Sequence, residues 1–399
     1  MLLSSTLLLL APSALALDFA CTEAGFRAAV TIGGGPHLID CQQSTTVALL
    51  AEIAIDNDVI IDGQGLLTLD GVAALRPIRI VPGVTVELRN LTITRGVAAA
   101  GGGIRNEGTL TLVGVTVQGN RAGRGGGISN AGALLLQSSQ ILDNFTTADL
   151  GGGDGGGIGG GNADIFDSTI AGNTAVDVGG GLALCNGSIV RSTISGNVSS
   201  RGGGLWSDSG RCTIQNSTFS NNISATTGGA IQLDDGSIDL IQTTIYDNTA
   251  LAGISGANLV CCDIAMIANS ILADGCSNSM AVLTNGGGNI ESPTADCGFD
   301  DPTDQTQVPA SELRLGPLAD NGGGTRTHLP LTDSPAIDGG VLGECLATDQ
   351  TGVARPQGLG CDVGAVEVLP EPAASAGLLA GLATLIALQT RGRRSRGWT

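Results

Sequence analysis

The chain has 399 residues, and 42% of them are hydrophobic although only 2% are aromatic. The 18 basic residues are all arginine, and 37 acidic residues give a net charge of −19. A chain this acidic repels nucleic acids and anionic membrane surfaces, which excludes nucleic acid as a partner. The acidic residues are interpreted as a solubilising surface, with loop-borne Ca²⁺ binding by aspartates as the alternative.

The N-terminus predicts export. Residues 1–16 are predicted to be a signal peptide. They contain an apolar stretch whose first residues are Leu7 to Leu10. Ala14-Leu15-Ala16 follows as a small-x-small cleavage site, which is typical of signal peptides. Ten cysteines fit the oxidising compartment to which such a signal leads.

Proximity along the chain suggests three disulfides. They join Cys21 to Cys41, Cys345 to Cys361, and, across one coil, Cys185 to Cys212. Four further cysteines cluster near the end of the regular repeats, at positions 261, 262, 276 and 297. A metal site is the weaker alternative there, because the chain has two histidines and no Cys-x-x-Cys pair.

Residues 17–52 are expected to form an N-terminal cap. Within them, Glu23 to Val30 could make a short helix over the open end of the fold. Such a cap is needed because an uncovered edge strand invites aggregation. Two less regular coils follow, with strand-like runs such as Val59-Ile60-Ile61 and Val84 to Leu88.

A glycine cluster then recurs through the middle of the chain. The motif Gly-Gly-Gly-Ile/Leu begins at residues 101, 125, 155, 179 and 202, and Gly228-Gly229-Ala230-Ile231 continues the series. The steps of 24, 30, 24, 23 and 26 residues indicate a solenoid. Glycine suits turns that need a positive φ or a close approach of backbones.

An asparagine follows each glycine cluster with the same period, at positions 120, 144, 173, 197, 222 and 248. Asparagine tolerates the left-handed region and can pass amide hydrogen bonds along a ladder. Short alternating runs such as Thr109 to Val113 lie between the two landmarks. The pattern predicts an all-β fold over residues 53–292, a single-stranded right-handed parallel β-helix of about nine coils of ~24 residues. A flexible linker, the alternative, would lack phased apolar residues.

The spacing of the repeats changes at two places in the chain. Residues 151–161 are nearly pure glycine around Asp154, and an insertion there is expected to bulge from the stack as a loop. From residue 293 to 367 the period stops, and proline, aspartate and turn dipeptides predict an irregular C-terminal region.

Two segments now resemble known families. Phe219 to Asn222 followed by Gly228 to Ile231 resembles the FxxN and GGA(I/L/V) pair of polymorphic outer-membrane proteins. The irregular region resembles a choice-of-anchor Q domain. The matching segments are Gly316 to Gly323, Thr327-His328, Ser334 to Asp338, Asp349-Gln350 and Cys361 to Glu367. Gly324 departs from the pattern, because that family often has proline at this position. Such domains precede varied C-terminal anchors.

Residues 368–399 resemble a PEP-CTERM sorting signal. Pro370-Glu371-Pro372 precedes the apolar run 373–388, which is followed by an arginine cluster. The 16-residue run is shorter than the ~20 residues of an ordinary spanning helix. The resemblance implies an exosortase-type processing enzyme as partner, transient inner-membrane anchoring through this short transmembrane segment, and a Gram-negative cell envelope.

Enzymes must also be considered, because pectate lyases and polygalacturonases are parallel β-helices. A glycosidase needs two carboxyl groups, ~6.5–9.5 Å apart in inverting enzymes. Asp234-Asp235 is the acidic doublet within the coils, and Asp239 and Asp247 lie nearby in sequence. The Gly-His-Gly and Arg-Ile-Lys signatures of polygalacturonases are missing from the chain, which has no lysine.

The remaining candidates favour structural roles. Three arginines beside the glycine turns could act as bases but are interpreted as solvated turn residues: Arg121, Arg124 and Arg201. Trp206 and Tyr246 are interpreted as surface or packing residues, and His328 as a structural turn residue. Gly159 to Asp164 is one degenerate copy of a calcium-binding nonapeptide, a weak signal because such sites need stacked copies.

The sequence therefore predicts no catalytic, cofactor or metal residue. We expect an exported, non-catalytic protein of the cell surface or extracellular matrix, associated with adhesion, other surface proteins or an extracellular polysaccharide. The alternative is a polysaccharide lyase or glycoside hydrolase.

Overall fold

The computed structural model describes residues 16–184, 186–252, 259–260, 263–273, 275–276, 281–282 and 284–370. The chain divides into two units, Met1–Glu367 and Val368–Thr399, and only the first three residues of the second are described. Most of the predicted signal peptide (1–16), Glu371, Pro372, the apolar run 373–388, Cys185, Cys261 and Cys262 lie outside the described residues. No helix of the described part is long and apolar enough to cross a membrane.

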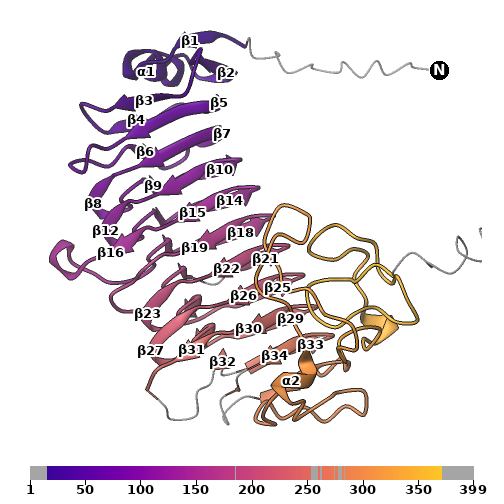
Figure 1. The fold of residues 1–399 in the computed structure, drawn as a ribbon. Coiled ribbons are helices and arrows are strands. Elements are labelled where there is room, and N and C mark those ends of the chain that lie inside the picture. The colour runs from indigo at the N-terminus through magenta and orange to yellow at the C-terminus, as the bar shows by residue number, and fades with distance from the viewer. Residues whose placement is uncertain are drawn as a thin grey trace, which may run out of the picture. The chain divides into compact units, whose positions relative to one another are not determined.

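The fold begins with a short helix above the first coil (Figure 1). Strand β1 (Asp18–Ala20) leads into α1 (Glu23–Ile32), which starts at Thr22, whose hydroxyl accepts a hydrogen bond from the Gly25 N–H at 3.1 Å. Phe26 is fully buried on the side of α1 that faces the first coil, and the disulfide Cys21–Cys41 closes this segment. The helix predicted at Glu23 is present.

Below α1 the chain winds into stacked parallel strands (Figure 1). Among the described residues, one sheet has nine strands: β4 (Ile53–Ile55), β6 (Ile78–Ile80), β9 (Ile104–Asn106), β13 (Ile128–Asn130), β17 (Ile158–Gly159), β20 (Leu182–Ala183), β24 (Leu205–Ser207), β28 (Ile231–Leu233) and β32 (Leu259–Val260). We call it the nine-stranded sheet. Each strand pairs in parallel with its counterpart one coil away, as in β9 with β13.

The large sheet takes the other strands of most coils, again in parallel pairs. Its described strands are β1, β2 (Gly34–Asp40), β3 (Thr45–Ala48), β5 (Val59–Asp70), β7 (Thr85–Thr94), β10 (Thr109–Val113), β11 (Thr116–Gln118), β14 (Ala133–Gln137), β15 (Gln140–Leu142), β18 (Asn162–Phe166), β19 (Thr169–Ala171), β21 (Gly187–Val190), β22 (Thr193–Ser195), β25 (Arg211–Gln215), β26 (Thr218–Ser220), β29 (Ser237–Ile241), β30 (Thr244–Tyr246), β33 (Asp263–Ala268), β34 (Ile271–Ala273), β35 (Ala281–Val282) and β36 (Ile290–Ser292).

Two short sheets complete the coils. They are β8 (Val97–Ala100), β12 (Arg121–Arg124) and β16 (Phe145–Thr146), and then β23 (Val198–Arg201), β27 (Ile223–Thr227) and β31 (Thr249–Ala250). The 30-residue coil with its insertion lies between them. The parallel β-helix of about nine coils predicted from the repeats is confirmed.

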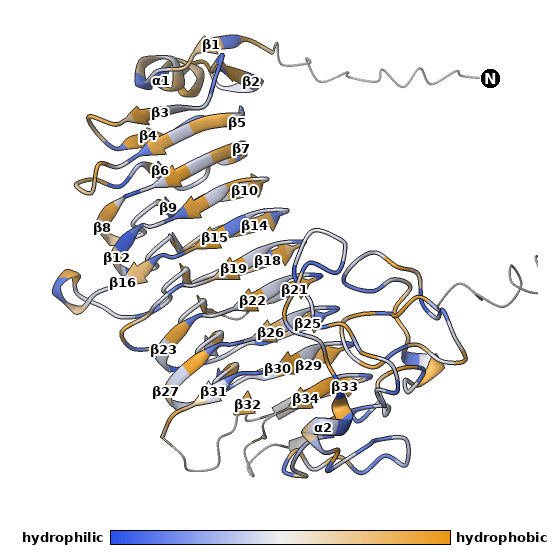
Figure 2. Cartoon of the chain, in the orientation of Figure 1, coloured by the Kyte–Doolittle hydropathy of each residue, from blue (hydrophilic) through white to orange (hydrophobic). Residues whose placement is uncertain are grey.

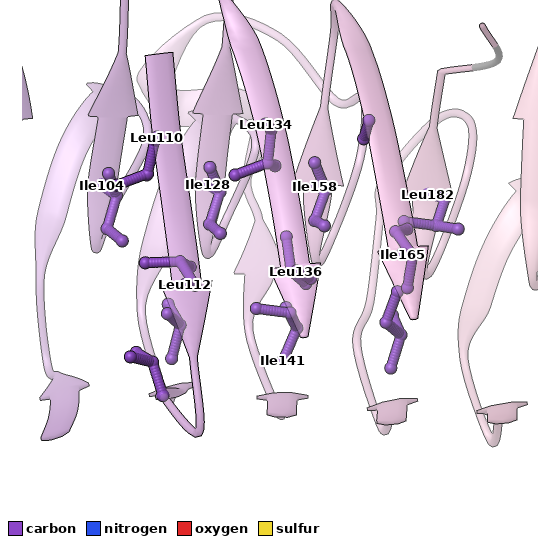
Figure 3. Packing of buried hydrophobic residues seen from close by; sticks show 14 of the residues in the cluster. Ile104, Leu110, Leu112, Ile128, Leu134, Leu136, Ile141, Ile158, Ile165 and Leu182 are labelled. Atoms are coloured by element: carbon purple, nitrogen blue, oxygen red, sulfur yellow. The ribbon is translucent and has the colours of Figure 1, made fainter. Parts of the chain in front are cut away.

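The core is a column of aliphatic side chains inside the coils (Figure 3). Ile104, Ile128, Ile158 and Leu182 occupy the same register position in successive strands, and all four are fully buried. Figure 2 shows the matching alternation of apolar and polar positions along the strands of the large sheet. Parallel stacking thus lets a chain poor in aromatics bury a continuous interior.

The glycine motif makes the turns for two separate reasons. The first glycine of each cluster has a positive φ, as at Gly101 (64°) and Gly179 (65°). The second lies against the next coil: a Cβ on Gly180 would come within 2.4 Å of the Gly203 carbonyl oxygen. Both roles expected of the motif are confirmed.

The periodic asparagines form a buried ladder of side-chain hydrogen bonds. Asn144 donates from both its backbone N–H and its Nδ2 to Oδ1 of Asn173, each at 3.0 Å, and Asn173 donates in the same way to Asn197. The ladder is as predicted, although none of these asparagines uses the left-handed region that this residue type tolerates. The residue just before each of them has the positive φ, for example Gly172 (67°).

A second ladder, of buried hydroxyls, lies five residues before the asparagines. The hydroxyl oxygens of Ser168 and Ser192 accept hydrogen bonds from the backbone N–H of the equivalent residue one coil earlier, at 3.0 and 3.1 Å. Thr243 stands at this position in a later coil and donates its N–H to Ser270. These hydroxyls satisfy backbone donors at bends where the strand pairing is interrupted.

The C-terminal region folds back onto the large sheet, where the orange and yellow segments of Figure 1 lie beside its later strands. It contains α2 (Ala310–Leu313) and a single 3-10 turn, η2 (Leu342–Glu344). Gln350 donates to the Thr193 hydroxyl at 3.0 Å and accepts from Thr218 at 2.7 Å, so it spans two coils. The predicted disulfide Cys345–Cys361 is formed in this region.

Candidate functional site

A column of outward-facing residues crosses the nine-stranded sheet. Register places Ser129, Gly159 and Ala183 in successive coils, followed by Trp206 and Gln232. Gly159, Ala183 and Gln232 are buried, whereas Ser129 and the indole of Trp206 are half-buried.

One carboxylate holds the indole and a guanidinium together. Asp234, just after β28, accepts hydrogen bonds from Arg201 Nη1 at 2.9 Å and from Trp206 Nε1 at 3.1 Å through the same oxygen. Its other oxygen accepts from Gln232 Nε2 at 2.9 Å. The Arg201 guanidinium carbon lies 5.9 Å from the Trp206 ring centre, within cation–π range.

The insertion predicted in the 30-residue coil brings a second acid to this face. The 3-10 turn η1 (Ala148–Leu150) precedes the predicted loop 151–161, and residues 151–157 lie outside strands. The prediction was wrong for Ile158–Gly159, which form β17 within the stack. Arg121 ties the insertion down by pairing with Asp149 and by donating to the Thr147 hydroxyl at 3.2 Å. The Asp154 carbonyl accepts from the Gly125 N–H at 2.9 Å.

Burial raises the pKa of the Asp154 carboxyl above its usual range. The negative charges of Asp177 and Asp208 raise this pKa further, whereas Arg124 and Arg201 oppose the shift. Asp154 therefore favours its protonated form more than a free aspartate does. Its electrostatic neighbours include Arg201, which also binds Asp234. We call Arg124, Asp154, Arg201, Trp206, Gln232 and Asp234 the Trp206 cluster.

Arg124 is unusual among the arginines. Fourteen of the 18 lie in the described part of the chain, and twelve of these form ion pairs within 4.0 Å. In that part, Arg124 and Arg326 are the two arginines that do not, and both side chains are exposed. Neither guanidinium is neutralised at ion-pair distance there, although Arg124 interacts electrostatically with Asp154.

The acidic residues flagged by the sequence do not assemble as a group. Asp235 is exposed beside Asp234, but Asp239 belongs to β29 of the large sheet and is held by two 2.8 Å hydrogen bonds from Arg211. Asp247 lies in a turn with φ of 64° and contributes to the electrostatics of His328. Proximity in sequence therefore misled here, because consecutive strands of one coil belong to different sheets.

His328 and Tyr246 pack the C-terminal region against the large sheet. Their rings meet edge to face with centres 4.8 Å apart, and His328 Nε2 lies 2.8 Å from the Ser220 hydroxyl while Nδ1 lies 2.7 Å from the Gly316 carbonyl. Burial lowers the pKa of this histidine, against smaller opposing effects of the Gly316 carbonyl and Asp247. Both residues thus have the structural role expected for them.

The possible metal-binding segments have other uses. Gly159 lies in β17 whereas Asp164 lies in β18 of the large sheet, where its Oδ1 accepts from the Ser188 N–H at 2.9 Å. Cys276 and Cys297 are close to the buried Glu291, but their sulfurs are bonded to each other and are not free thiolates. Cys212 is disulfide-bonded, but its predicted partner Cys185 lies outside the described residues, so that pairing stays a prediction.

Sequence reasoning did not foresee the Trp206 cluster as a unit. The sequence analysis names Arg124, Arg201, Trp206 and Asp234 separately and interprets Trp206 as a surface or packing residue. The missing signal was register: counting residues from each glycine cluster places Trp206 and Gln232 at the same outward position of consecutive coils.

No family model matches the chain, and no curated protein matches it. A solved structure described as pectate lyase Pel9A is similar to it, with a TM-score of 0.57 and 15% sequence identity over 89% of this chain and 97% of that one. At this identity the likeness shows the fold. The chain is a parallel β-helix, a fold that it shares with that structure. Its resemblances to polymorphic outer-membrane proteins, choice-of-anchor Q domains and PEP-CTERM tails remain predictions.

Proposed function

We propose that this chain is an exported β-helix protein that binds an extracellular polysaccharide across the nine-stranded sheet, at the Trp206 cluster. The observation that carries the proposal is the shared hydrogen bonding of Arg201 and Trp206 to one oxygen of Asp234. This contact fixes an aromatic ring beside charged donors and acceptors. A sugar needs the same combination, because its C–H face packs on a ring while its hydroxyls need hydrogen-bond partners.

The surroundings of the ring support this function. Gly159, Ala183 and Gln232 are buried and Trp206 is half-buried, so a glycan would contact this face at the indole itself. Arg124 adds a cation without an ion pair in the described part of the chain. The net charge of −19 opposes strongly anionic polymers, so a neutral or weakly charged glycan is the expected ligand.

A binding assay with two aromatic variants tests the proposal. Wild type is applied to a glycan array, and isothermal titration then compares it with Trp206→Ala and with Phe145→Ala, which removes an exposed aromatic from a different sheet. We expect affinity to fall at least tenfold in Trp206→Ala and to be unchanged in Phe145→Ala. The proposal fails if wild type binds no glycan or if both variants bind as well as wild type.

Glycoside hydrolysis is a second candidate, favoured by the raised pKa of Asp154. A general acid must hold its proton near the working pH in order to protonate the leaving oxygen, while a second carboxylate activates water or attacks the sugar. Asp177 and Asp208 are the carboxylates that act on Asp154 electrostatically, so they are candidates for the second role.

Release of reducing ends tests this second candidate. Activity that Asp154→Asn abolishes, with products lacking the ultraviolet absorbance of an unsaturated uronide, would support hydrolysis. Unsaturated products would indicate a lyase instead. Binding without any turnover would leave the chain a non-catalytic glycan-binding protein, as the sequence favoured.

Export and sorting belong to the same proposal. Described disulfides such as Cys21–Cys41 and Cys345–Cys361 support passage through an oxidising compartment. We expect an exosortase-type enzyme to cleave near Pro370, after transient anchoring of the tail in the inner membrane of a Gram-negative envelope. Mass spectrometry of the mature protein's C-terminus checks this, and an intact C-terminal arginine cluster would contradict it.

A further inference from the structure

A cavity of about 440 Å³ opens where the C-terminal region meets the large sheet. Its floor consists of the outward residues of three consecutive strands, β15, β19 and β22, and its wall is the loop 320–326. The floor residues are Gln140, Leu142, Thr169, Ala171, Thr193 and Ser195. This volume lies within the ~300–1,000 Å³ range of small-molecule sites.

The cavity exists because the C-terminal region covers only part of the large sheet. Thr193 in β22 is buried beneath it, whereas Gln140 in β15 is exposed beyond it. Two hydrogen bonds hold the loop 320–326 against the sheet at the edge of the covered part. The Thr193 hydroxyl donates to the Arg326 carbonyl, and the Thr325 hydroxyl donates to the Arg191 carbonyl at 3.1 Å. The wall is therefore anchored to the sheet through its backbone.

The side chains that line the cavity are open to a ligand. Arg326 has no ion pair in the described part of the chain, and the side chains of Gln140, Thr169 and Ser195 have no hydrogen-bond partner among the described residues. Asp320, on the same loop, accepts one hydrogen bond, from the Gly322 N–H at 3.1 Å. A guanidinium, a carboxylate and several neutral polar groups thus face one space.

These groups select the charge of the ligand. The Arg326 guanidinium can bind a carboxylate through two parallel hydrogen bonds. Asp320 would repel a doubly charged phosphate but can accept hydrogen bonds from hydroxyls. Leu142 and Ala171 supply an apolar floor against which the C–H face of a sugar ring can pack.

We propose that this cavity binds a uronic acid, either free or as the terminal residue of an oligosaccharide. Arg326 holds the carboxylate, and Thr169, Ser195 and Asp320 hydrogen bond to the ring hydroxyls. The site lies on the large sheet, whereas the Trp206 cluster lies on the nine-stranded sheet, so it does not depend on the function proposed for that cluster.

Titration of the full chain with glucuronic acid, galacturonic acid, glucose and inorganic phosphate tests the site. We expect saturable binding of at least one uronic acid, weaker binding of glucose, and no tighter binding of phosphate. Arg326→Gln should lower uronate affinity at least tenfold, and Thr169→Val several-fold. Arg89→Gln, which removes an ion-paired surface arginine from the large sheet, should leave affinity unchanged. Thermal melting checks that each variant is folded.

The outcomes separate this site from the Trp206 cluster and from other ligands. Uronate binding that survives Trp206→Ala but not Arg326→Gln supports the proposal. Equal affinity for glucose, tighter binding of phosphate, no uronate binding by wild type, or unchanged binding in Arg326→Gln would each overturn it. Comparing the monosaccharide with a short oligouronate distinguishes the sources: both should need Arg326, and oligomer binding independent of Arg326 would refute recognition of a terminal residue.

Discussion

Removing one asparagine from the buried ladder should destabilise the whole solenoid. Asn173 takes part in four side-chain hydrogen bonds: it accepts two from Asn144, and it donates to the Ile141 carbonyl at 2.9 Å and to Asn197 at 3.0 Å. The residue is fully buried, so water cannot replace these partners. In Asn173→Ala the backbone N–H of Asn144 loses its acceptor in the interior.

The expected loss follows from the number of bonds. At about 1 kcal/mol for each net hydrogen bond, four bonds amount to about 4 kcal/mol of unfolding free energy. With an unfolding entropy of about 2.1 cal/mol/K for each residue, a unit of this size should melt about 5 °C lower. Because each coil contacts only its neighbours, hydrogen exchange should rise most in β15, β19 and β22.

Asn162→Ala is the matched control. Asn162 lies in the same coil, its side chain is exposed on β18, and that side chain has no hydrogen bond among the described residues. Its substitution should change stability by less than about 0.5 kcal/mol. Denaturation followed by circular dichroism measures both variants. Equal stability of Asn173→Ala and Asn162→Ala would refute the idea that the ladder holds the coils together.

Three further predictions concern other buried features. Arg355 and Glu367 form a fully buried ion pair at 3.1 Å. Glu367→Gln leaves the Arg355 charge buried without its partner, so it should lower the unfolding free energy of the C-terminal region by about 3 kcal/mol. Amide hydrogen exchange should become faster in this region, and unchanged protection would contradict the prediction. Burial raises the pKa of the Glu291 carboxyl, so the folded protein is more stable when this group is protonated. This stabilisation is present at low pH and is lost as pH rises through the folded pKa. Glu291→Gln should therefore melt above wild type at ~pH 8 and lose this advantage by ~pH 4. Gly180→Ala should cost about 3 kcal/mol or more because its Cβ meets a carbonyl at 2.4 Å, while Gly343→Ala, with open space around it, should melt like wild type.

The coiled architecture was predictable because its steric demands repeat in the sequence. Gly101 and its equivalents need a positive φ, and the glycines after them cannot accept a Cβ, so both positions leave a periodic mark. The hydroxyl ladder has a periodic mark as well, because Ser168 and Ser192 each precede a ladder asparagine by five residues.

The packing of the C-terminal region could not be predicted in the same way. Gln350 reaches Thr218 across 132 residues and Thr193 across 157, and such single contacts have no period. The Trp206 cluster could be predicted in part. Its residues could be named from the sequence, but Asp154 joins them only because an insertion of unknown shape folds beside Arg201.

The covering of the large sheet by the C-terminal region has a consequence for how the molecule is made. An exported chain crosses the membrane with its N-terminus first, so the early coils can stack before the residues near Gln350 arrive. The polar groups at Thr193 and Thr218 must then stay hydrated until the last part of the chain arrives and displaces that water. Completion of the polypeptide, and not the winding of its coils, is thus the event that seals this flank.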